Sequence, residues 1–149
     1  MADEASDGHA RARLVTGAGE TTGAGAVPGS RRIGNLAPNQ TPGLVCAHHH
    51  LYSVLARGMP APTVTPTDFV GILEQVWWRL DQALDLEIIA AAARLGALEA
   101  LEAGCTAIVD HHESPDAIDG SLSAIADACA EVGVRVMTAY GVTDRHGPV

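Results

Sequence analysis

Three short apolar runs, each followed at once by polar residues, constrain the fold of this 149-residue chain more than any other feature. The runs cover residues 44–47, 106–109 and 134–140, and each has the length of a buried strand. Segments with helical periodicity separate them. Strands alternating with helices form parallel sheets with right-handed crossovers, so the carboxyl ends of all three strands should meet at one edge. The polar residues after the strands are therefore expected to lie close together.

The first helical segment follows a start signal at residues 65–68. Thr65 is expected to cap it, with Pro66 at the first helical position and Asp68 reaching back in a capping box. The helix should then run to about Ala83 and connect the first strand to a second helix.

The other two helices carry start and stop signals of their own. Asp85 is expected to cap the second helix, and Gly104 supplies the positive φ that ends it. Ser121 is expected to cap the third helix, which Gly133 ends. The spacing of apolar residues predicts the buried face of the second helix as Ile88, Ile89, Ala92, Leu95, Leu98 and Leu101.

The first 41 residues differ in composition from the rest of the chain. They alternate Gly with Ala, Thr and Pro and hold few large apolar side chains. Such a segment buries too little surface to offset the entropy lost on ordering, so we expect residues 1–41 to be irregular. Residues 42–149 are expected to form the folded α/β part. The Gly-Ala runs also lack the preceding strand that a dinucleotide-binding loop needs.

Charge and hydropathy exclude several classes of function. The 9 basic and 18 acidic residues give a net charge of −9, which argues against nucleic-acid binding. The longest apolar stretch, residues 88–93, is far shorter than the roughly 20 residues that span a bilayer. The amino terminus lacks the pattern of a secretion signal, so we expect a cytoplasmic protein with no membrane partner. Cys46, Cys105 and Cys129 lie far apart in apolar runs and are expected to be buried and reduced.

The first strand leads into three consecutive histidines. His48 and His50 are two residues apart, so their rings should project from the same face of an extended strand, with His49 on the other face. Two imidazoles placed in this way can bind one metal ion. A His-x-His pair alone is weak evidence, because surface histidines also occur in pairs. Its position directly after the opening strand of a β/α series strengthens the metal-binding interpretation.

Four segments, in order along the chain, resemble the amidohydrolase superfamily of metal-dependent hydrolases. Residues 42–58 are similar to the first barrel strand of that superfamily, with its Pro-Gly and His-x-His pattern. Residues 77–81, 104–112 and 143–147 are similar, more narrowly, to the SsnA-like aminohydrolase and chlorohydrolase branch, which is related to nucleobase deaminases. The resemblance covers about residues 42–148.

The resemblance implies a TIM-type (β/α)8 barrel, of which this chain would hold the first three β/α units after a mostly irregular segment. It implies a divalent metal, zinc before iron or another ion, with His48 and His50 as two of its ligands. It also implies hydrolysis of a carbon–nitrogen bond, other than a peptide bond, in a small heterocyclic substrate by metal-activated water. This is deaminase chemistry, and no residue is assigned as the catalytic acid or base.

The polar residues at the other strand ends, together with one tryptophan, are candidates for contact with a small-molecule substrate. These candidates are Trp78, Asp110, His111, His112, Asp144, Arg145 and His146. Each also has a simpler role open to it. Polar residues after a strand often cap or support the next element, and an Asp-Arg pair on a loop contributes little if it is exposed. Adjacent tryptophans on a helix cannot face the same way, so one of Trp77 and Trp78 is expected in the core.

The resemblance stops short of a complete site. The superfamily's other metal ligands, two histidines from middle strands and an aspartate from the last strand, have no counterparts in this sequence. A catalytic zinc needs three protein ligands and an open position, and three β/α units are less than half of a barrel of about 250 residues. We therefore expect an incomplete fragment with an incompletely coordinated metal, completed by a homo-oligomer or by a second half.

Two further functions remain open. The chain could be a non-catalytic remnant of such a barrel, partly folded and self-associating through exposed sheet edges. It could also be a metal-binding module without catalysis, holding the ion weakly through two histidines.

Overall fold

The computed structural model describes residues 36–145 of the chain, which divides into two units, 1–43 and 44–149. In the described part of the first unit, the Gln40 amide donates a hydrogen bond to the Ala37 carbonyl oxygen at 2.9 Å and closes a turn. All helices and strands of the described residues belong to the second unit. None of these helices is long and apolar enough to cross a membrane.

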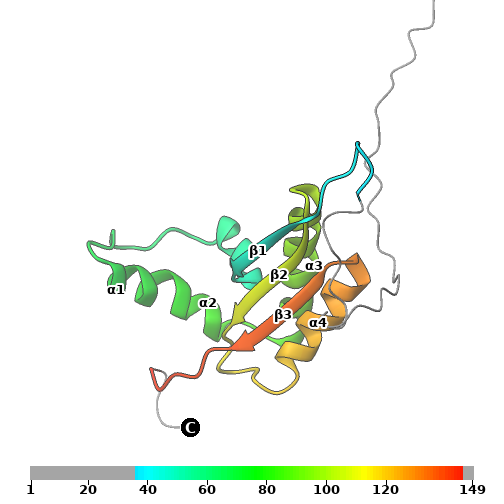
Figure 1. The fold of residues 1–149 in the computed structure, drawn as a ribbon. Coiled ribbons are helices and arrows are strands. Elements are labelled where there is room, and N and C mark those ends of the chain that lie inside the picture. The colour runs from blue at the N-terminus through cyan, green and yellow to red at the C-terminus, as the bar shows by residue number, and fades with distance from the viewer. Residues whose placement is uncertain (1–35, 146–149) are drawn as a thin grey trace, which may run out of the picture. The chain divides into compact units, whose positions relative to one another are not determined.

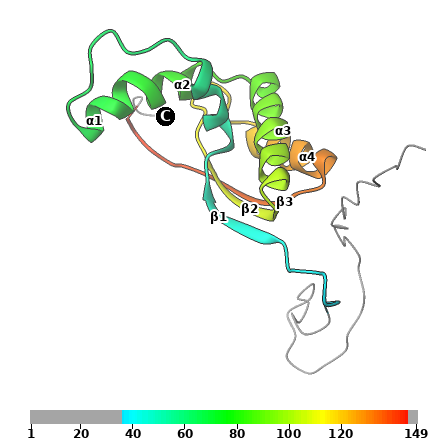
Figure 2. The same ribbon diagram turned by 90° about the horizontal axis from the view of Figure 1, so that it is seen from above.

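The second unit is built around a three-stranded parallel sheet in the order β1-β2-β3. The strands are β1 (Leu44–His49), β2 (Cys105–His112) and β3 (Arg135–Tyr140). The long helix between β1 and β2 and the helix between β2 and β3 lie together on one face of the sheet (Figures 1 and 2). The predicted alternation of strands and helices and the parallel sheet are confirmed. The second strand is longer than predicted, so the polar residues 110–112 lie inside it.

Helix α3 (Leu86–Glu102) begins and ends where the sequence predicts. The Asp85 carboxylate accepts a hydrogen bond from the Ile88 amide at 2.8 Å, which satisfies one of the free amides of the first turn. After the helix, Gly104 has a φ of 85°, a conformation that residues with a Cβ rarely adopt.

Helix α4 (Ser121–Val132) has the predicted end and a different start. Gly133, with a φ of 94°, ends it as expected. At its start, Gly120 takes the cap position with a φ of 83°. The Ser121 hydroxyl donates to the Ile118 carbonyl oxygen at 2.8 Å, so it stabilises the preceding turn and the prediction of Ser121 as the cap is wrong.

The predicted helix over residues 65–83 is wrong in its start and in its continuity. The cap is Asp68, whose carboxylate accepts from the Gly71 amide at 2.8 Å, and Thr65 lies before the helix. Aspartate caps at least as well as threonine, and here it is the residue that leads directly into the apolar run. The helix consists of α1 (Phe69–Ile72), a π-helical segment η3 (Leu73–Trp77) and α2 (Trp78–Gln82).

A short 3₁₀ helix, η2 (Leu51–Gly58), follows β1 and was not predicted. It packs against α3, whose buried residues are mostly small: Ile89, Ala92, Ala93, Gly96, Ala97 and Ala100. A Cβ on Gly96 would lie 2.8 Å from Leu51 Cδ2, so the glycine allows this close approach. The predicted buried face of α3 is therefore wrong in part: Ile88, Leu95 and Leu98 are 36%, 42% and 48% exposed, because the neighbouring small residues face the core.

The opposite face of the sheet is covered by no helix of the described residues (Figure 2). On the covered face, Ile108 of β2 is 1% exposed. On the open face, Val45 of β1 and Met137 of β3 are 61% and 65% exposed. The prediction that the first strand is buried is therefore wrong within residues 36–145, because β1 pairs with one neighbour and has one open side.

All three cysteines are free, as predicted. Cys129 lies in the core, and burial raises the pKa of its thiol to about 11. Cys46 and Cys105 are half-buried at the margin of the core, so the prediction of full burial holds for Cys129 alone.

Candidate functional site

A one-residue irregularity in β1 decides which way its histidines face. Cys46 lies opposite Ile108 of β2, whereas His49 lies opposite Asp110, so β1 has one more residue than β2 between these two pairs. Residues opposite each other in a parallel pair share a face of the sheet, which places Cys46 and His49 on the covered face. The extra residue forms a bulge. It turns the first and third histidines to the open face; regular alternation would place them with Cys46.

The rings of His48 and His50 lie side by side on this open face. Their centroids are 5.0 Å apart and the rings meet edge to face. His48 is exposed and His50 is half-buried. The Nδ1 atom of His49 is buried and has no hydrogen-bond partner among the described residues. The structure therefore brings the two candidate metal ligands together and separates the middle histidine from them.

A hydrogen bond fixes the protonation of the His50 ring. Its Nδ1 lies 2.8 Å from the carbonyl oxygen of His111. A carbonyl oxygen only accepts, so Nδ1 must carry the proton and donate it, and Nε2 of the neutral ring keeps its lone pair. Metal-binding histidines commonly hold their second nitrogen in this way. The His50 ring is therefore in the form in which Nε2 can bind a metal ion.

His111 adds a third imidazole to the open face. Its ring centroid lies 5.3 Å from that of His50. A Cβ on Gly141 would lie 2.7 Å from His111 Nε2 and 2.6 Å from Glu113 Oε1, so the glycine after β3 makes room for both side chains. Within residues 36–145, no three His, Cys, Asp or Glu side chains are arranged to hold a metal ion.

Asp110 points to the covered face and is 1% exposed. Its Oδ1 accepts a hydrogen bond from the Leu51 amide at 2.8 Å, and its Oδ2 accepts one from the Thr138 hydroxyl at 3.0 Å. A buried carboxylate is tolerated only when its oxygens are satisfied in this way. Asp110 therefore connects the end of β1, the middle strand and β3.

His112 is the second buried polar residue of β2. The Ser114 hydroxyl donates to the Ala117 carbonyl oxygen at 2.9 Å, so it accepts from His112 Nε2, which lies 3.0 Å away. His112 Nε2 therefore carries the proton. Burial lowers the pKa of His112 more than the nearby Asp110 carboxylate raises it, which favours the neutral ring.

Arg145 joins three segments at the carboxyl end of the sheet. Its guanidinium forms ion pairs with Asp81 of α2 and with Glu113, which follows β2. Its Cζ also lies 5.3 Å from the centroid of the Trp78 ring, within the range of a cation–π contact. The Asp81 side chain is 1% exposed and that of Arg145 is 20% exposed, so this ion pair is largely removed from water.

The same cluster includes Tyr52, at the start of η2. Burial raises the pKa of Tyr52, and the Asp81 carboxylate raises it further. Neither Tyr52 nor Asp81 was predicted as a site residue: Tyr52 lies in η2, which was not predicted, and Asp81 lies in a helical segment far from the strand ends in the sequence. A single acid between the buried residues Leu80 and Leu84 was the available signal for Asp81.

The remaining predicted residues are spread more widely. Trp77 packs against the core, whereas Trp78 lies beside Arg145, so the two tryptophans do differ in environment. Asp144 is exposed. His146 lies outside the described residues.

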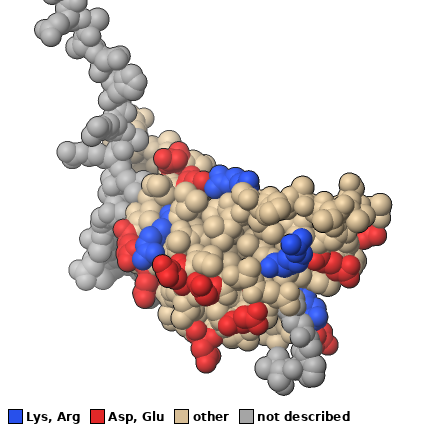
Figure 3. Space-filling view, turned by 180° about the vertical axis from the view of Figure 1, so that it is seen from behind, with Lys and Arg blue, Asp and Glu red and all other residues tan. Residues whose placement is uncertain are grey.

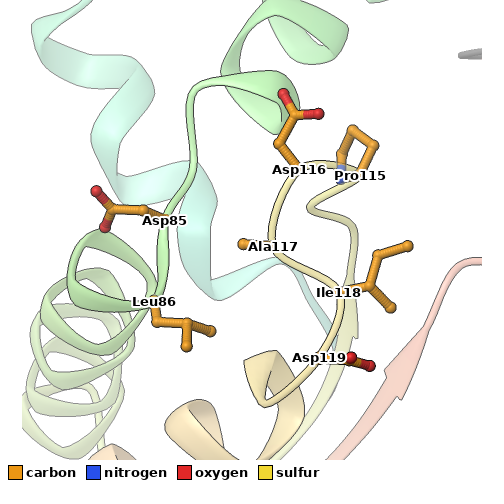
Figure 4. A pocket seen from close by; sticks show the side chains of 7 residues that line it. All are labelled: Asp85, Leu86, Pro115, Asp116, Ala117, Ile118 and Asp119. Carbon is orange, nitrogen blue, oxygen red and sulfur yellow. The ribbon is translucent and has the colours of Figure 1, made fainter.

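A separate hollow lies between the start of α3 and the loop that joins β2 to α4 (Figure 4). It is lined by Asp85, Leu86, Pro115, Asp116, Ala117, Ile118 and Asp119, none of which is a predicted site residue. One of its acids, Asp85, is engaged as the cap of α3.

On the face of the molecule seen from behind the view of Figure 1, Arg side chains lie among Asp and Glu side chains, as Figure 3 shows.

Comparisons with known proteins identify the family of this chain. A family model described as the amidohydrolase family matches residues 40–147. The 8-oxoguanine deaminase of Pseudomonas aeruginosa is 35% identical over 103 residues, which are 67% of this chain and 22% of that protein. The 5'-deoxyadenosine deaminase of Methanopyrus kandleri is 33% identical over 103 residues, which are 69% of this chain and 21% of that protein.

A solved structure is similar as well. It is a mutant of atrazine chlorohydrolase TrzN from Arthrobacter aurescens TC1, complexed with zinc and atraton. The match has a TM-score of 0.52 and 32% identity, and covers 66% of this chain and 23% of that one. The matched part of the chain thus spans less than a quarter of the length of each of these three relatives. The family match covers most of residues 42–149 and includes the paired histidines, and the chain therefore belongs to the amidohydrolase family.

Proposed function

We propose that this chain supplies the first metal-binding strand of a metal-dependent hydrolase that acts on a carbon–nitrogen bond of a small heterocyclic substrate. The observation that carries the proposal is the pair of rings of His48 and His50 on one face of the sheet, 5.0 Å apart. The hydrogen bond from His50 Nδ1 to the His111 carbonyl oxygen supports it, since it leaves Nε2 in the metal-binding form.

The two imidazoles fit a zinc ion, and also iron or another divalent ion, as part of a larger set of ligands. When bound in such a site, a divalent ion supplies an activated water molecule at neutral pH and polarises the atom under attack. A catalytic zinc has three protein ligands and an open position. The remaining ligands would come from outside residues 36–145, either from further polypeptide or from a second copy of this chain.

The side chains around the two histidines divide into two groups under this proposal. His111 shares the open face with His50 and would contact the substrate. Trp78 and Arg145, with the neighbouring Asp144 and His146, would line the substrate side at the carboxyl end of the sheet. Asp110 and His112 are buried on the other face and would support the site from behind.

The three-stranded sheet would be part of a larger barrel. The open face would be the interior of a (β/α)8 barrel, with β1, β2 and β3 as the strands of its first three β/α units, and the match to the TrzN structure supports this assignment. A second half or another copy of the chain would complete the barrel. Neither nucleic acid nor a membrane is a proposed partner, and the cytoplasm is the proposed compartment.

The test combines metal analysis with activity. The purified full chain is loaded with zinc, and ammonia release is measured with 8-oxoguanine and 5'-deoxyadenosine as probes. We expect zinc to bind and the double variant His48→Ala, His50→Ala to lose it. His49→Ala is the matched control, because that ring faces the other way, and it should bind zinc like the wild type.

Each outcome of this experiment identifies one function. Zinc binding with ammonia release indicates an enzyme completed by self-association. Zinc binding without release, regained when a polypeptide carrying the other barrel strands is added, indicates a complementing half. Zinc that stays bound in the double variant would contradict the proposed ligands.

The open sheet face favours a second candidate function, a non-catalytic piece that associates with itself. Val45 and Met137 are both more than half exposed on this face, and β1 and β3 each have an unpaired edge within the described residues. Sedimentation of the full chain and of Met137→Asp tests this candidate. Oligomers that dissociate in the variant, with no zinc bound by either, would support it over the hydrolase.

A further inference from the structure

We propose that Asp110 is a positioning residue for His50. It fixes the backbone immediately after His50, so that the His50 ring reaches the His111 carbonyl oxygen and presents Nε2 to the open face. This inference rests on the proposed role of His50 as a metal ligand.

The hydrogen bonds of Asp110 lie at the end of the histidine segment. Oδ1 accepts from the amide of Leu51, the residue next to His50 in sequence, at 2.8 Å. Leu51 is itself 1% exposed and begins η2. Oδ2 accepts from the Thr138 hydroxyl of β3 at 3.0 Å, which orients the carboxylate. The carboxylate thus ties the end of the histidine segment to two strands.

Strand pairing alone does not orient His50. The ladder between β1 and β2 is irregular between Cys46 and His49, and His50 lies beyond the last residue of β1. Two contacts replace the ladder at this point. The Asp110 carboxylate holds the Leu51 amide, and the next residue along β2, His111, holds the His50 ring through its carbonyl oxygen. Asp110 and His111, which follow each other in β2, therefore hold the neighbouring residues Leu51 and His50.

The Asp110 carboxylate is buried at a cost in free energy. Removing a charged group from water is unfavourable, and an apolar side chain of similar size often fills such a position at a lower cost. Asp110 offsets that cost only through hydrogen bonds that connect separate segments. This arrangement is more typical of a residue that positions neighbouring segments than of one that only fills space in the core.

The test uses the metal-free full chain with ¹⁵N-labelled histidine, at a pH where the rings are neutral. In the wild type, the His50 ring should carry its proton on Nδ1. In Asp110→Val, which removes both acceptors, the His50 ring should show a mixture of tautomers, and zinc affinity should fall about 10-fold or more. Asp110→Asn keeps an oxygen that accepts from the Leu51 amide, so we expect it to preserve the wild-type tautomer.

Thr138→Val is the matched control, because it removes the hydrogen bond to Oδ2 and leaves the one to Leu51 in place. It should keep the Nδ1 proton on His50. An Asp110→Val variant that also keeps this tautomer would overturn the proposal. If Asp110→Val does not fold, hydrogen exchange of the wild-type Leu51 amide decides: slow exchange supports the proposal and rapid exchange overturns it.

The result separates this inference from the proposed function. A wild-type chain that binds no zinc would contradict the proposed function, while the tautomer comparison would still establish or overturn the role of Asp110. If the wild type binds zinc and Asp110→Val keeps the wild-type tautomer, the proposed function is supported and the role of Asp110 is overturned.

Discussion

The two faces of the sheet are stabilised in different ways. On the covered face, Ile108 packs against α3 and α4, and the polar side chains of Asp110 and His112 are buried and hydrogen-bonded. On the open face, Met137 is largely exposed and the histidine rings lie side by side. Alternate residues of one strand, β2, serve the two faces. Because successive residues of a strand point to opposite faces, a residue that packs in the core and a residue of the candidate site can be neighbours in the sequence.

The largest expected effect tests this comparison directly. Ile108→Ala removes a side chain that is 1% exposed and should lower the free energy of unfolding by about 3 kcal/mol. Met137→Ala, on the neighbouring strand and the open face, should change it by less than about 0.5 kcal/mol. Urea unfolding of both variants measures the difference. Equal losses would mean that the open face is covered in solution.

A smaller effect on stability is expected at the carboxyl end of the sheet, where an ion pair, and not apolar packing, joins the segments. Arg145→Met leaves the buried carboxylate of Asp81 without its ion-pair partner and should cost roughly 2 kcal/mol, less than a fully buried pair because Arg145 is 20% exposed. Arg57→Met is the control, since the Arg57–Glu99 pair is exposed, and it should show no measurable change. Thermal unfolding compares them, and equal melting temperatures would argue against a stabilising cluster around Arg145.

The end of α4 provides a test of backbone conformation on the covered side. Gly133 has a φ of 94° and nothing within 4 Å of an added Cβ, so Gly133→Ala should cost about 1 kcal/mol through backbone strain alone. Gly58 also has open space around an added Cβ but no positive φ. Gly58→Ala should therefore be neutral in the same urea titration, and a loss there would indicate a contact that the strain argument overlooks.

The smallest effect is a dependence on pH through His112. Burial lowers the pKa of His112 in the folded protein below its unfolded value of about 6.5. The unfolded state then binds more protons as the pH falls through 6.5, so the stability that His112 contributes is present above that pH and is lost toward the folded pKa. His112→Gln should lose less stability than the wild type between pH 7.5 and 5.5. Parallel pH profiles of the two proteins would contradict this assignment.

Features that depend on neighbouring residues in the chain could be predicted from the sequence. The caps at Asp85 and Gly133, the order of strands and helices and the common face of His48 and His50 all follow from local spacing and backbone preferences. Even so, the common face of the two histidines was predicted from regular alternation, whereas in the structure a bulge determines which face it is.

Features that depend on packing between segments could not be predicted in this way. The buried face of α3 is set by the close approach of Leu51 to Gly96, which hydrophobic spacing does not reveal. The partners of Arg145 come from positions more than 30 residues away, so a local interpretation could not identify them. The π-helical segment before Trp78 likewise leaves no signal in a pattern of apolar residues.

The two register shifts between β1 and β2 run in opposite directions, so the offset at Leu44 is restored at His49. A gene that lost the single codon for Ala47 would still encode every residue of the candidate site. The histidine rings would still face the open side, because one residue would then separate Cys46 from His49, as one separates Ile108 from Asp110, and regular alternation would keep His48 and His50 on that face. At this point of the polypeptide, the number of residues decides whether the strand bulges, whereas the pairing of His49 with Asp110 decides which way the rings face.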